Sequence, residues 1–246
     1  MSYPVFLGEF GAVAPGDRVR VTGAEARHAV SVRRIGVGEV IRVADGRGRA
    51  VQGSVVVADR AELVVEVGDV LAEGQRGVRL VAVQALAKGD RSDLAVELLT
   101  ELGADEIVAW SASRSVVVWQ GERGEKSLAK WAMTAREAAK QSRRFSVPEV
   151  THATTKQVIA RCERADLVLV LHEEATRRLV DVVREWDAPD HADIVLITGP
   201  EGGISPVELD AFVAAGGVPV LLTDNVLRTS TAGGVALAQL QAVIPG

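Results

Sequence analysis

The sequence predicts an α/β protein with two domains, a small β domain over residues 1–73 and a larger domain with a parallel sheet over residues 74–246. In the first domain, short valine-rich segments alternate with turn residues, a pattern typical of antiparallel strands. In the second, near-continuous apolar runs alternate with helix-like segments, which favours a parallel sheet covered by helices on both faces. The composition loosens at Glu73-Gly74-Gln75-Arg76-Gly77, where we place the boundary.

The first domain is predicted to contain four strands and one helix. The strands are expected at residues 18–21, 39–44, 50–57 and 61–67. Asp45-Gly46 followed by Arg47-Gly48 favours a hairpin, because glycine adopts positive φ readily. The helix is expected at residues 24–34, where alanine and valine recur on one side and arginine residues occupy the other.

The second domain is predicted to alternate five strands with five helices. The strands are expected at residues 78–85, 106–110, 167–171, 194–198 and 218–222. The helices are expected at residues 93–102, 126–143, 175–186, 206–215 and 229–243. Because ligands of open parallel sheets bind beyond the carboxyl ends of the strands, we expect function in the loops there.

The composition excludes several classes of protein. Of the 246 residues, 48% are apolar, which is enough to bury a core without disulfides, and the one cysteine, Cys162, is expected to be a small buried hydrophobe. The four histidines are not spaced like metal ligands, so we expect no metal. The first ten residues lack a basic leader, and apolar runs long enough to span a membrane are absent from the sequence. We therefore expect a cytoplasmic protein with no membrane partner.

The charge distribution is uneven. A net charge of −5 argues against general nucleic-acid coating, because phosphate binding depends on lysine and arginine. Between Gln120 and Arg144, however, basic residues outnumber acidic ones. The basic residues are Arg123, Lys126, Lys130, Arg136, Lys140, Arg143 and Arg144, and the acidic ones are Glu122, Glu125 and Glu137. A basic helix face in an acidic protein is compatible with a solvated surface and with a phosphate-facing one.

The loop after the strand at residues 194–198 reads Gly-Pro-Glu-Gly-Gly-Ile. It leads into a helix start, since Ser205 fits an N-cap, Pro206 fits the first helical position and Glu208 fits the returning half of a capping box. Glycines at a helix N-terminus expose N–H donors and let a ligand approach closely. Taken alone, the loop is equally compatible with a plain strand-to-helix turn, and its glycine spacing matches neither a dinucleotide fingerprint nor a Walker loop.

A second polar loop follows the strand at residues 218–222 and carries Arg228-Thr229-Ser230-Thr231 into the last helix. Hydroxyl side chains there commonly cap the helix. Arg228 fits either a salt bridge to Asp224 or electrostatic stabilisation of a substrate. His172 ends the strand at residues 167–171, although a lone histidine is more often structural. Lys88-Gly89-Asp90-Arg91, after the first strand of the domain, is by itself an ordinary polar turn.

Together these segments form an ordered set that covers essentially the whole chain. The set comprises His28 with Arg33-Arg34, Lys88-Gly89-Asp90-Arg91, Glu101-Leu102-Gly103-Ala104, residues 137–144 with Pro148, residues 199–203, and residues 227–232. In this order and spacing it resembles the 16S ribosomal RNA uracil-N3 methyltransferases of the SPOUT, or trefoil-knot, superfamily. Single motifs are weak, but the combination is specific.

The resemblance implies a PUA-like N-terminal β-barrel that helps to hold RNA, followed by a SPOUT trefoil-knot methyltransferase domain. General folding rules would not predict the knot, because threaded connections are nearly absent from proteins. It also implies a homodimer and a pocket of three loops that binds S-adenosylmethionine. The implied cofactor-binding residues are Leu171, His172, Thr198, Gly199, Pro200, Glu201, Gly202, Gly203, Leu222, Leu227, Arg228, Thr229 and Thr231. Ser230 departs from the family pattern, where a glutamate is common.

The implied reaction methylates N3 of a uridine in 16S ribosomal RNA of the small ribosomal subunit. We expect Arg228 to stabilise negative charge on the uracil, whereas the general base is not identifiable from sequence. The residues expected to contact RNA phosphates are Arg33, Arg34, Lys88, Arg91, Arg143 and Arg144. Two alternatives stay open: a methyltransferase of the same superfamily that acts on another RNA, and a non-catalytic RNA-binding or ribosome-assembly factor.

Overall fold

A computed structural model of the chain describes residues 3–74 and 77–244. It divides into two compact units, one of residues 1–75 with 136–147 and the other of residues 76–135 with 148–246. The end of helix α3 (Gly121–Gln141) is thus grouped with the N-terminal unit. The predicted boundary between residues 73 and 74 stays a prediction, and two residues of its loosened stretch, Gln75 and Arg76, lie outside the described residues.

The N-terminal unit is built on a five-stranded sheet with the order β1-β3-β4-β5-β2. Its strands are β1 (Val5–Leu7), β2 (Arg18–Thr22), β3 (Val40–Ala44), β4 (Arg49–Ala58) and β5 (Glu62–Ala72). The four predicted strands are all present. The prediction of a purely antiparallel sheet is wrong at one edge, because β1 pairs with β3 in parallel. With three residues, β1 is too short to show the alternation by which strands are predicted.

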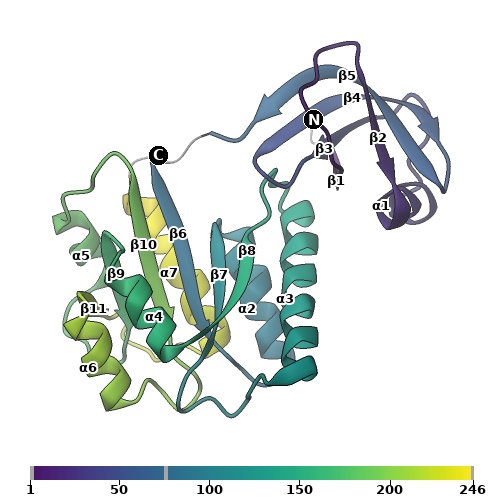
Figure 1. The fold of residues 1–246 in the computed structure, drawn as a ribbon. Helices are drawn as coiled ribbons and strands as arrows, with labels where there is room; N and C mark the ends of the chain where they lie inside the picture. Colours follow the sequence, from purple (N-terminus) through teal and green to yellow (C-terminus); the bar gives the residue numbers. More distant parts are fainter. Residues whose placement is uncertain (1–2, 75–76, 245–246) are drawn as a thin grey trace. The chain divides into compact units, whose positions relative to one another are not determined.

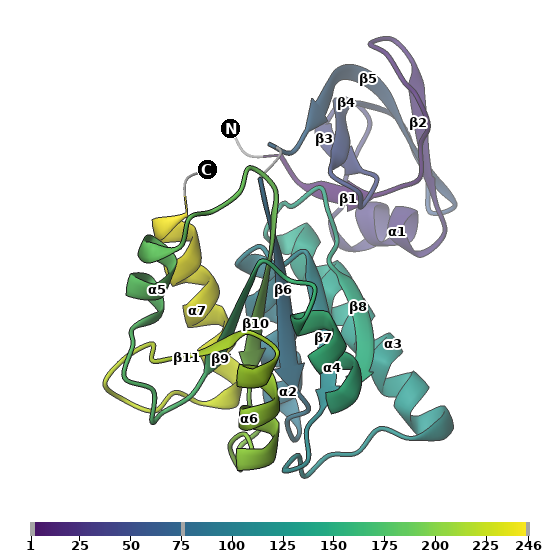
Figure 2. The same cartoon turned by 60° about the vertical axis from the view of Figure 1, so that its left-hand side comes forward.

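Alternating side chains and two irregularities shape this sheet. In β2, Val19 and Val21 point into the core, while Arg18 and Arg20 face solvent. The pairing of β4 with β5 shifts register at Gln52/Gly53 and again at Val55/Val57, and such bulges bend a strand and increase its twist. A Cβ at residue 53 would lie 1.9 Å from the Glu66 carbonyl oxygen, so only glycine fits. The result is the curled mixed sheet seen in Figures 1 and 2.

The helix expected at residues 24–34 is present in two parts. An α-helical turn, α1 (Gly23–Arg27), continues into a π-helical turn, η1 (His28–Val32). The amide of Arg33 donates to the His28 carbonyl over 3.0 Å, and Arg34 then ends the segment with a φ of 57°. Isolated π-helical turns often accompany functional sites.

The C-terminal unit is built on a six-stranded sheet with the order β11-β9-β10-β6-β7-β8, and every pair in it is parallel. The strands are β6 (Val78–Ala85), β7 (Glu106–Ser111), β8 (Glu149–Thr154), β9 (Leu167–Leu171), β10 (Ala192–Thr198) and β11 (Gly217–Val220). The helices besides α3 are α2 (Asp90–Glu101), α4 (Thr155–Cys162), α5 (Leu179–Glu185), α6 (Pro206–Ala214) and α7 (Thr229–Val243). The predicted α/β fold class is confirmed, whereas the threading of a knot stays a prediction.

The sequence missed β8 and α4. The strand β8 lies at the edge of the sheet and carries several polar, partly exposed residues, so it lacks the continuous apolar run of the inner strands. The helix α4 has only eight residues and begins directly at the end of that strand, with Thr154 as a capping box N-cap. Because β8 and α4 follow each other without a linker, the sequence contains no turn residues that would mark a boundary between them.

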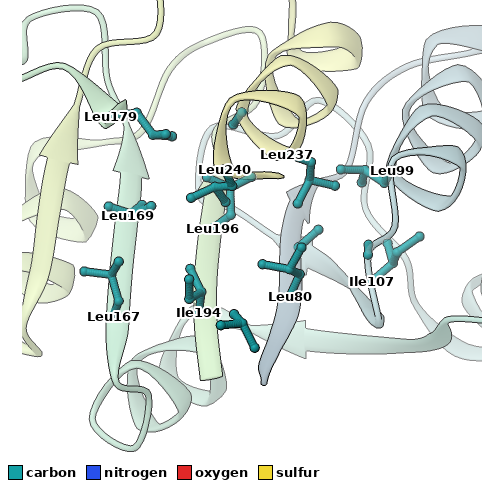
Figure 3. Close-up of a cluster of buried hydrophobic side chains, with 14 of the residues drawn as sticks. Leu80, Leu99, Ile107, Leu167, Leu169, Leu179, Ile194, Leu196, Leu237 and Leu240 are labelled. Carbon is teal, nitrogen blue, oxygen red and sulfur yellow. The ribbon is translucent and has the colours of Figure 1, made fainter. Parts of the chain in front are cut away.

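Both faces of the C-terminal sheet are buried. One face packs a leucine-rich cluster against α2, α5, α7 and the first part of α3, and Figure 3 shows Leu80, Leu196 and Leu237 meeting there. The other face packs valines of the sheet against Cys162 of α4 and Phe212 of α6, and these two helices lie in front of the sheet in Figure 2. This double burial explains why the inner strands read as continuous apolar runs. Across the described ranges, no helix is long and apolar enough to cross a membrane.

Candidate functional site

A cavity of about 310 Å³ lies where β9, β10 and β11 end. Leu171, Thr198 and Val220 close these three strands and line it, together with the loops that follow each of them. This is the edge of an open parallel sheet at which ligands are expected. The volume lies at the lower end of the range of small-molecule sites, roughly 300–1,000 Å³.

The structure brings most of the predicted cofactor residues together around this cavity. All of them line it except Gly202 and Thr231. Both exceptions stabilise the loops instead, since the Gly202 carbonyl accepts a 3.3 Å hydrogen bond from Arg114 and the Thr231 hydroxyl donates to the Arg228 carbonyl over 3.2 Å. The lining residues that lie outside the predicted loops at residues 171–172, 198–204 and 222–231 and were missed are Glu173, Val220, Leu221 and Ala232. Their only signal was proximity along the chain to the predicted ones.

The glycine-rich loop is held tightly at the start of α6. The predicted capping box is confirmed: the Ser205 hydroxyl accepts from the Glu208 amide over 3.3 Å, and the Glu208 carboxylate accepts from the Ser205 amide over 3.2 Å. Gly203 has a φ of 72°, in the left-handed region that disfavours other residues. A Cβ at residue 199 would lie 2.7 Å from Ile204 Cγ1. The loop therefore keeps its shape only with glycine at these two positions.

The Glu208 carboxylate does more than cap the helix. It is buried and also accepts from the Ser113 amide over 2.8 Å, from the Ser113 hydroxyl over 2.7 Å and from the Thr155 hydroxyl over 3.0 Å. Burial by itself raises the pKa of Glu208, but the hydrogen bonds from Ser113, Ser205 and Thr155 outweigh it and hold the pKa below its ordinary value of 4.5. An ionised buried carboxylate thus fastens the glycine-rich loop to the segment after β7 and to the start of α4.

The third loop presents Arg228 at the cavity. Asp224 forms its salt bridge with Arg178, so the alternative in which Asp224 holds Arg228 is wrong. Within residues 3–74 and 77–244, Arg228 makes no ion pair, and its side chain is exposed. Its carbonyl accepts from the amides of Thr231 and Ala232, each over 2.9 Å, which fixes the backbone at the start of α7. The guanidinium is therefore available to a ligand.

Charge and polarity vary around the cavity. Carboxylates of Glu173, Glu201 and Asp224 and guanidinium groups of Arg91 and Arg228 line it. Its apolar wall consists of Leu171, Ile204, Val220, Leu222 and Leu227. His172 is held at the end of β9, because its amide donates to the Val220 carbonyl over 3.1 Å and its Nδ1 accepts from the Glu174 amide over 3.2 Å. Such a cavity suits a ligand that combines an apolar ring with charges of both signs.

The predicted RNA-contact residues fall into two groups. Lys88 and Arg91 belong to the C-terminal unit, where the Lys88 amide donates to Glu201 over 3.4 Å and Arg91 lines the cavity. Arg33 and Arg143 belong to the N-terminal unit and line a second, smaller cavity there, which Arg34 and Arg144 do not line. Arg144 is half-buried and donates to the Ser146 hydroxyl over 3.1 Å.

The basic cluster at residues 120–144 is partly neutralised. Lys126 pairs with Glu122, Lys130 pairs with Asp93, and Lys140 pairs with both Glu25 and Glu137. The surplus of positive charge counted along the sequence therefore does not form one free cationic face. Basic side chains without an ion pair among the described residues include Arg228 at the first cavity and Arg143 at the second.

Comparison with known proteins identifies the family to which the chain belongs. The model of the RNA methyltransferase domain matches residues 75–241. The chain belongs to the RNA methyltransferase family. The model of the RNA methyltransferase PUA domain matches residues 21–68, which lie in the curled sheet of the N-terminal unit. The cavity at the ends of β9, β10 and β11 lies within the matched methyltransferase domain.

Several members of the RNA methyltransferase family are similar along the whole chain. The ribosomal RNA small subunit methyltransferase E of Mycobacterium bovis is 43% identical over 94% of this chain and 87% of its own length. The protein of the same name from Bacillus subtilis is 29% identical over 89% of this chain and 88% of its own length. The crystal structure of the Neisseria gonorrhoeae protein of that name, bound to S-adenosyl methionine, superimposes with a TM-score of 0.86 at 26% identity and covers 98% of both chains.

Proposed function

We propose that this RNA methyltransferase transfers a methyl group from S-adenosylmethionine to N3 of a uridine in 16S ribosomal RNA of the small subunit. The observation that carries the proposal is the single cavity built by three strand-end loops, at the position where an open parallel sheet binds small ligands. The names of the mycobacterial and Bacillus relatives support a small-subunit RNA substrate, and the donor bound to the Neisseria protein supports the choice of cofactor.

The cavity fits S-adenosylmethionine in size and chemistry. The apolar wall around Leu171, Leu222 and Leu227 suits the adenine ring. The carboxylates of Glu173 and Glu201 complement the sulfonium and ammonium groups, and Arg91 and Arg228 complement the carboxylate, whereas Asp224 is already paired with Arg178. When bound, the donor supplies an electrophilic methyl group on a positively charged sulfur.

The chain itself has to orient the uracil and to stabilise charge on it. The N3 atom of uracil carries a proton, and its loss places negative charge on the flanking carbonyl oxygens. Arg228, exposed at the cavity and without an ion pair in the described part of the chain, lies where a guanidinium could stabilise that charge. Fixing the reacting groups in line contributes roughly 7–11 kcal/mol in favourable model systems. The uridine has to leave its stack to reach the cavity.

We also propose that the protein acts in the cytoplasm as a homodimer. Support for association comes from the resemblance to a family whose members form homodimers. Sedimentation of the purified protein tests this, and a monomer at micromolar concentration would contradict it.

Two measurements test the proposed reaction. Calorimetry with S-adenosylmethionine comes first, because a protein with no measurable affinity for it is not the enzyme proposed here. Small ribosomal subunits from a strain that lacks the enzyme are then incubated with protein and labelled donor, and the modified base is mapped. We expect one methylated uridine at N3 in 16S ribosomal RNA. Label confined to transfer RNA or to the large subunit would instead identify a related enzyme with another substrate.

A further inference from the structure

A second cavity, about 150 Å³ in volume, lies entirely within the N-terminal unit. It is enclosed by β1, the π-helical turn η1 and the end of α3, and its polar lining comes from His28, Arg33, Lys140, Gln141 and Arg143. The Phe6 ring contributes an apolar part and packs edge to face with the His28 ring at 6.4 Å between centroids. No carboxylate lines this cavity within the described residues, in contrast to the cavity of the C-terminal unit.

Lys140 forms a fixed wall of the cavity. Lys140 is 7% exposed, and its ammonium group pairs with Glu25 over 3.1 Å and with Glu137 over 2.8 Å. Glu25 in turn accepts from the Leu7 amide over 3.1 Å. This pairing joins α3 to α1 and β1, and it compensates the buried charge of Lys140. Both nearby carboxylates are therefore already engaged and do not neutralise the arginines.

Arg33 and Arg143 supply the uncompensated charge. Both side chains are exposed, and neither makes an ion pair in residues 3–74 and 77–244. They reach the same cavity from different elements, Arg33 from the end of η1 and Arg143 from the turn after α3. Guanidinium groups donate in a planar fork that matches the oxygens of a phosphate.

The backbone at Arg143 has a conformation that favours glycine. Its φ is 63°, in the left-handed region, and it directly follows the end of α3. Its amide donates to the Lys140 carbonyl over 3.1 Å, and the next amide donates to the Ala139 carbonyl over 2.9 Å. Helix ends of this kind favour glycine, because other residues are strained there. Arginine therefore stands at a position that glycine would occupy with less strain.

We infer that this cavity binds one phosphate group of the RNA substrate, with Arg33 and Arg143 donating from two sides and His28 as a third donor. The inference rests on the proposed function only in taking RNA as the ligand. A volume of about 150 Å³ accommodates a phosphate but not a whole nucleotide. The contact is therefore to the RNA backbone, so it positions the substrate and reads no sequence.

The test measures the affinity for a 16S ribosomal RNA transcript by filter binding at several salt concentrations. The variants are Arg33→Ala, Arg143→Ala and the double substitution. The control is Arg60→Ala, which removes the same charge from the turn between β4 and β5, away from the cavity. One lost phosphate contact flattens the slope of log affinity against log salt by about 0.7 to 0.9. We expect the double variant to lose that amount, each single variant to lose most of it, and Arg60→Ala to lose none.

Two results would overturn the inference. If the double variant had the same salt slope as Arg60→Ala, the cavity would not hold RNA. If its slope fell by about 1.5 or more, the two arginines would contact two separate phosphates. At equal ionic strength, inorganic phosphate is expected to displace the transcript from wild type better than chloride does, because the two guanidinium groups match phosphate oxygens. For the double variant it should be no better than chloride, and an equal advantage of phosphate in both proteins would place its binding outside this cavity.

Arg143→Gly separates binding from folding. Glycine removes the side chain and relieves the left-handed backbone, so the melting temperature should not fall, while the RNA affinity should drop as in Arg143→Ala. Wild-type affinity in Arg143→Gly would refute the role of the side chain. Calorimetry with S-adenosylmethionine is run on the same variants and should show no change. If wild type fails to bind the donor while the arginine variants still lose RNA affinity, the proposed reaction fails and the phosphate site stands.

Discussion

The two cavities differ in what surrounds their charges. The cavity in the C-terminal unit has an apolar wall, three carboxylates and two arginines, whereas the cavity in the N-terminal unit has two unpaired arginines, a histidine and a lysine whose charge is compensated. The first suits a ligand with a ring and charges of both signs, and the second suits a small anion. The comparison teaches that the proposed site for chemistry and the proposed site for positioning RNA are built by separate parts of the chain.

The two units also anchor their loops in the same way, with a carboxylate that accepts several backbone or hydroxyl hydrogen bonds. In the C-terminal unit this is Glu208, which holds the glycine-rich loop. In the N-terminal unit it is Glu73, which accepts from the amides of Phe145 and Ser146 after α3. Glu208 is buried, whereas Glu73 is half-buried, so we expect the two anchors to differ in strength.

The largest expected effect is on turnover, from Arg228→Ala. Removing a donor that stabilises developing negative charge typically lowers kcat by roughly 10²- to 10³-fold. Because Arg228 is exposed, the fold should survive, and RNA affinity should change little. Single-turnover methylation with donor and RNA saturating measures the effect. Arg184→Ala, an exposed arginine on α5, is the matched control, and equal turnover in the two variants would remove Arg228 from the mechanism.

The next effect is on stability, from Glu208→Gln. The amide cannot replace the charge that accepts from Ser113, Ser205 and Thr155, so the C-terminal unit should lose about 1–3 kcal/mol. Urea unfolding followed by tryptophan fluorescence measures this unit alone, because all four tryptophans belong to it. Weaker donor binding should accompany the loss, since the carboxylate holds the loop at the cavity. Unchanged midpoint and donor affinity would show that the network is dispensable.

The effect of Glu208→Gln on the free energy of unfolding should also depend on pH. The pKa of Glu208 is lower in the folded protein than its ordinary value of 4.5, so its stabilisation is fully present above that pH and is lost as the pH falls through the lower, folded value. The difference in unfolding free energy between wild type and Glu208→Gln should therefore be constant near neutral pH and shrink below pH 4.5. A difference that stayed constant down to pH 3 would place its origin in packing instead of charge.

The smallest effect is expected from Glu73→Gln in the N-terminal unit. Burial raises the pKa of Glu73, but hydrogen bonds from Ser146 and Phe145 and the nearby Arg144 guanidinium outweigh this effect. The pKa of Glu73 is therefore lowered, as it is for Glu208. Partial exposure screens this charge, and we expect a loss of about 1 kcal/mol or less. Far-ultraviolet circular dichroism follows the change, since no tryptophan lies in this unit. A loss larger than that of Glu208→Gln would reverse the ranking of the two anchors.

Local patterns in the sequence were sufficient for much of the fold. The continuous apolar runs predicted β6, β7, β9, β10 and β11, and the Ser205 capping box was visible because its partner is three residues away. Where the signal was short or polar, as in β1 and β8, it failed. The division of the expected helix at residues 24–34 into α1 and a π-helical turn also had no local signal.

The candidate site was predictable as a set of loops but not as a set of contacts. Strand ends and glycine motifs singled out the loops at one edge of the sheet, and the family resemblance joined residues 171–172, 198–204 and 222–231 into one pocket. The links that shape the site connect residues far apart in sequence, such as Ser113 with Glu208 and Arg178 with Asp224. Likewise, charge counting could not separate the paired Lys140 from Arg143, only three residues further on.

The lone cysteine gives this enzyme a built-in chemical reporter. Cys162 ends α4 and is buried against the sheet, and that burial raises the pKa of its thiol to about 11. Alkylating reagents attack thiolates, so the folded chain should resist them at neutral pH. The rate at which iodoacetamide modifies Cys162 would then time the lifting of α4 away from the sheet, without any label or substitution being introduced.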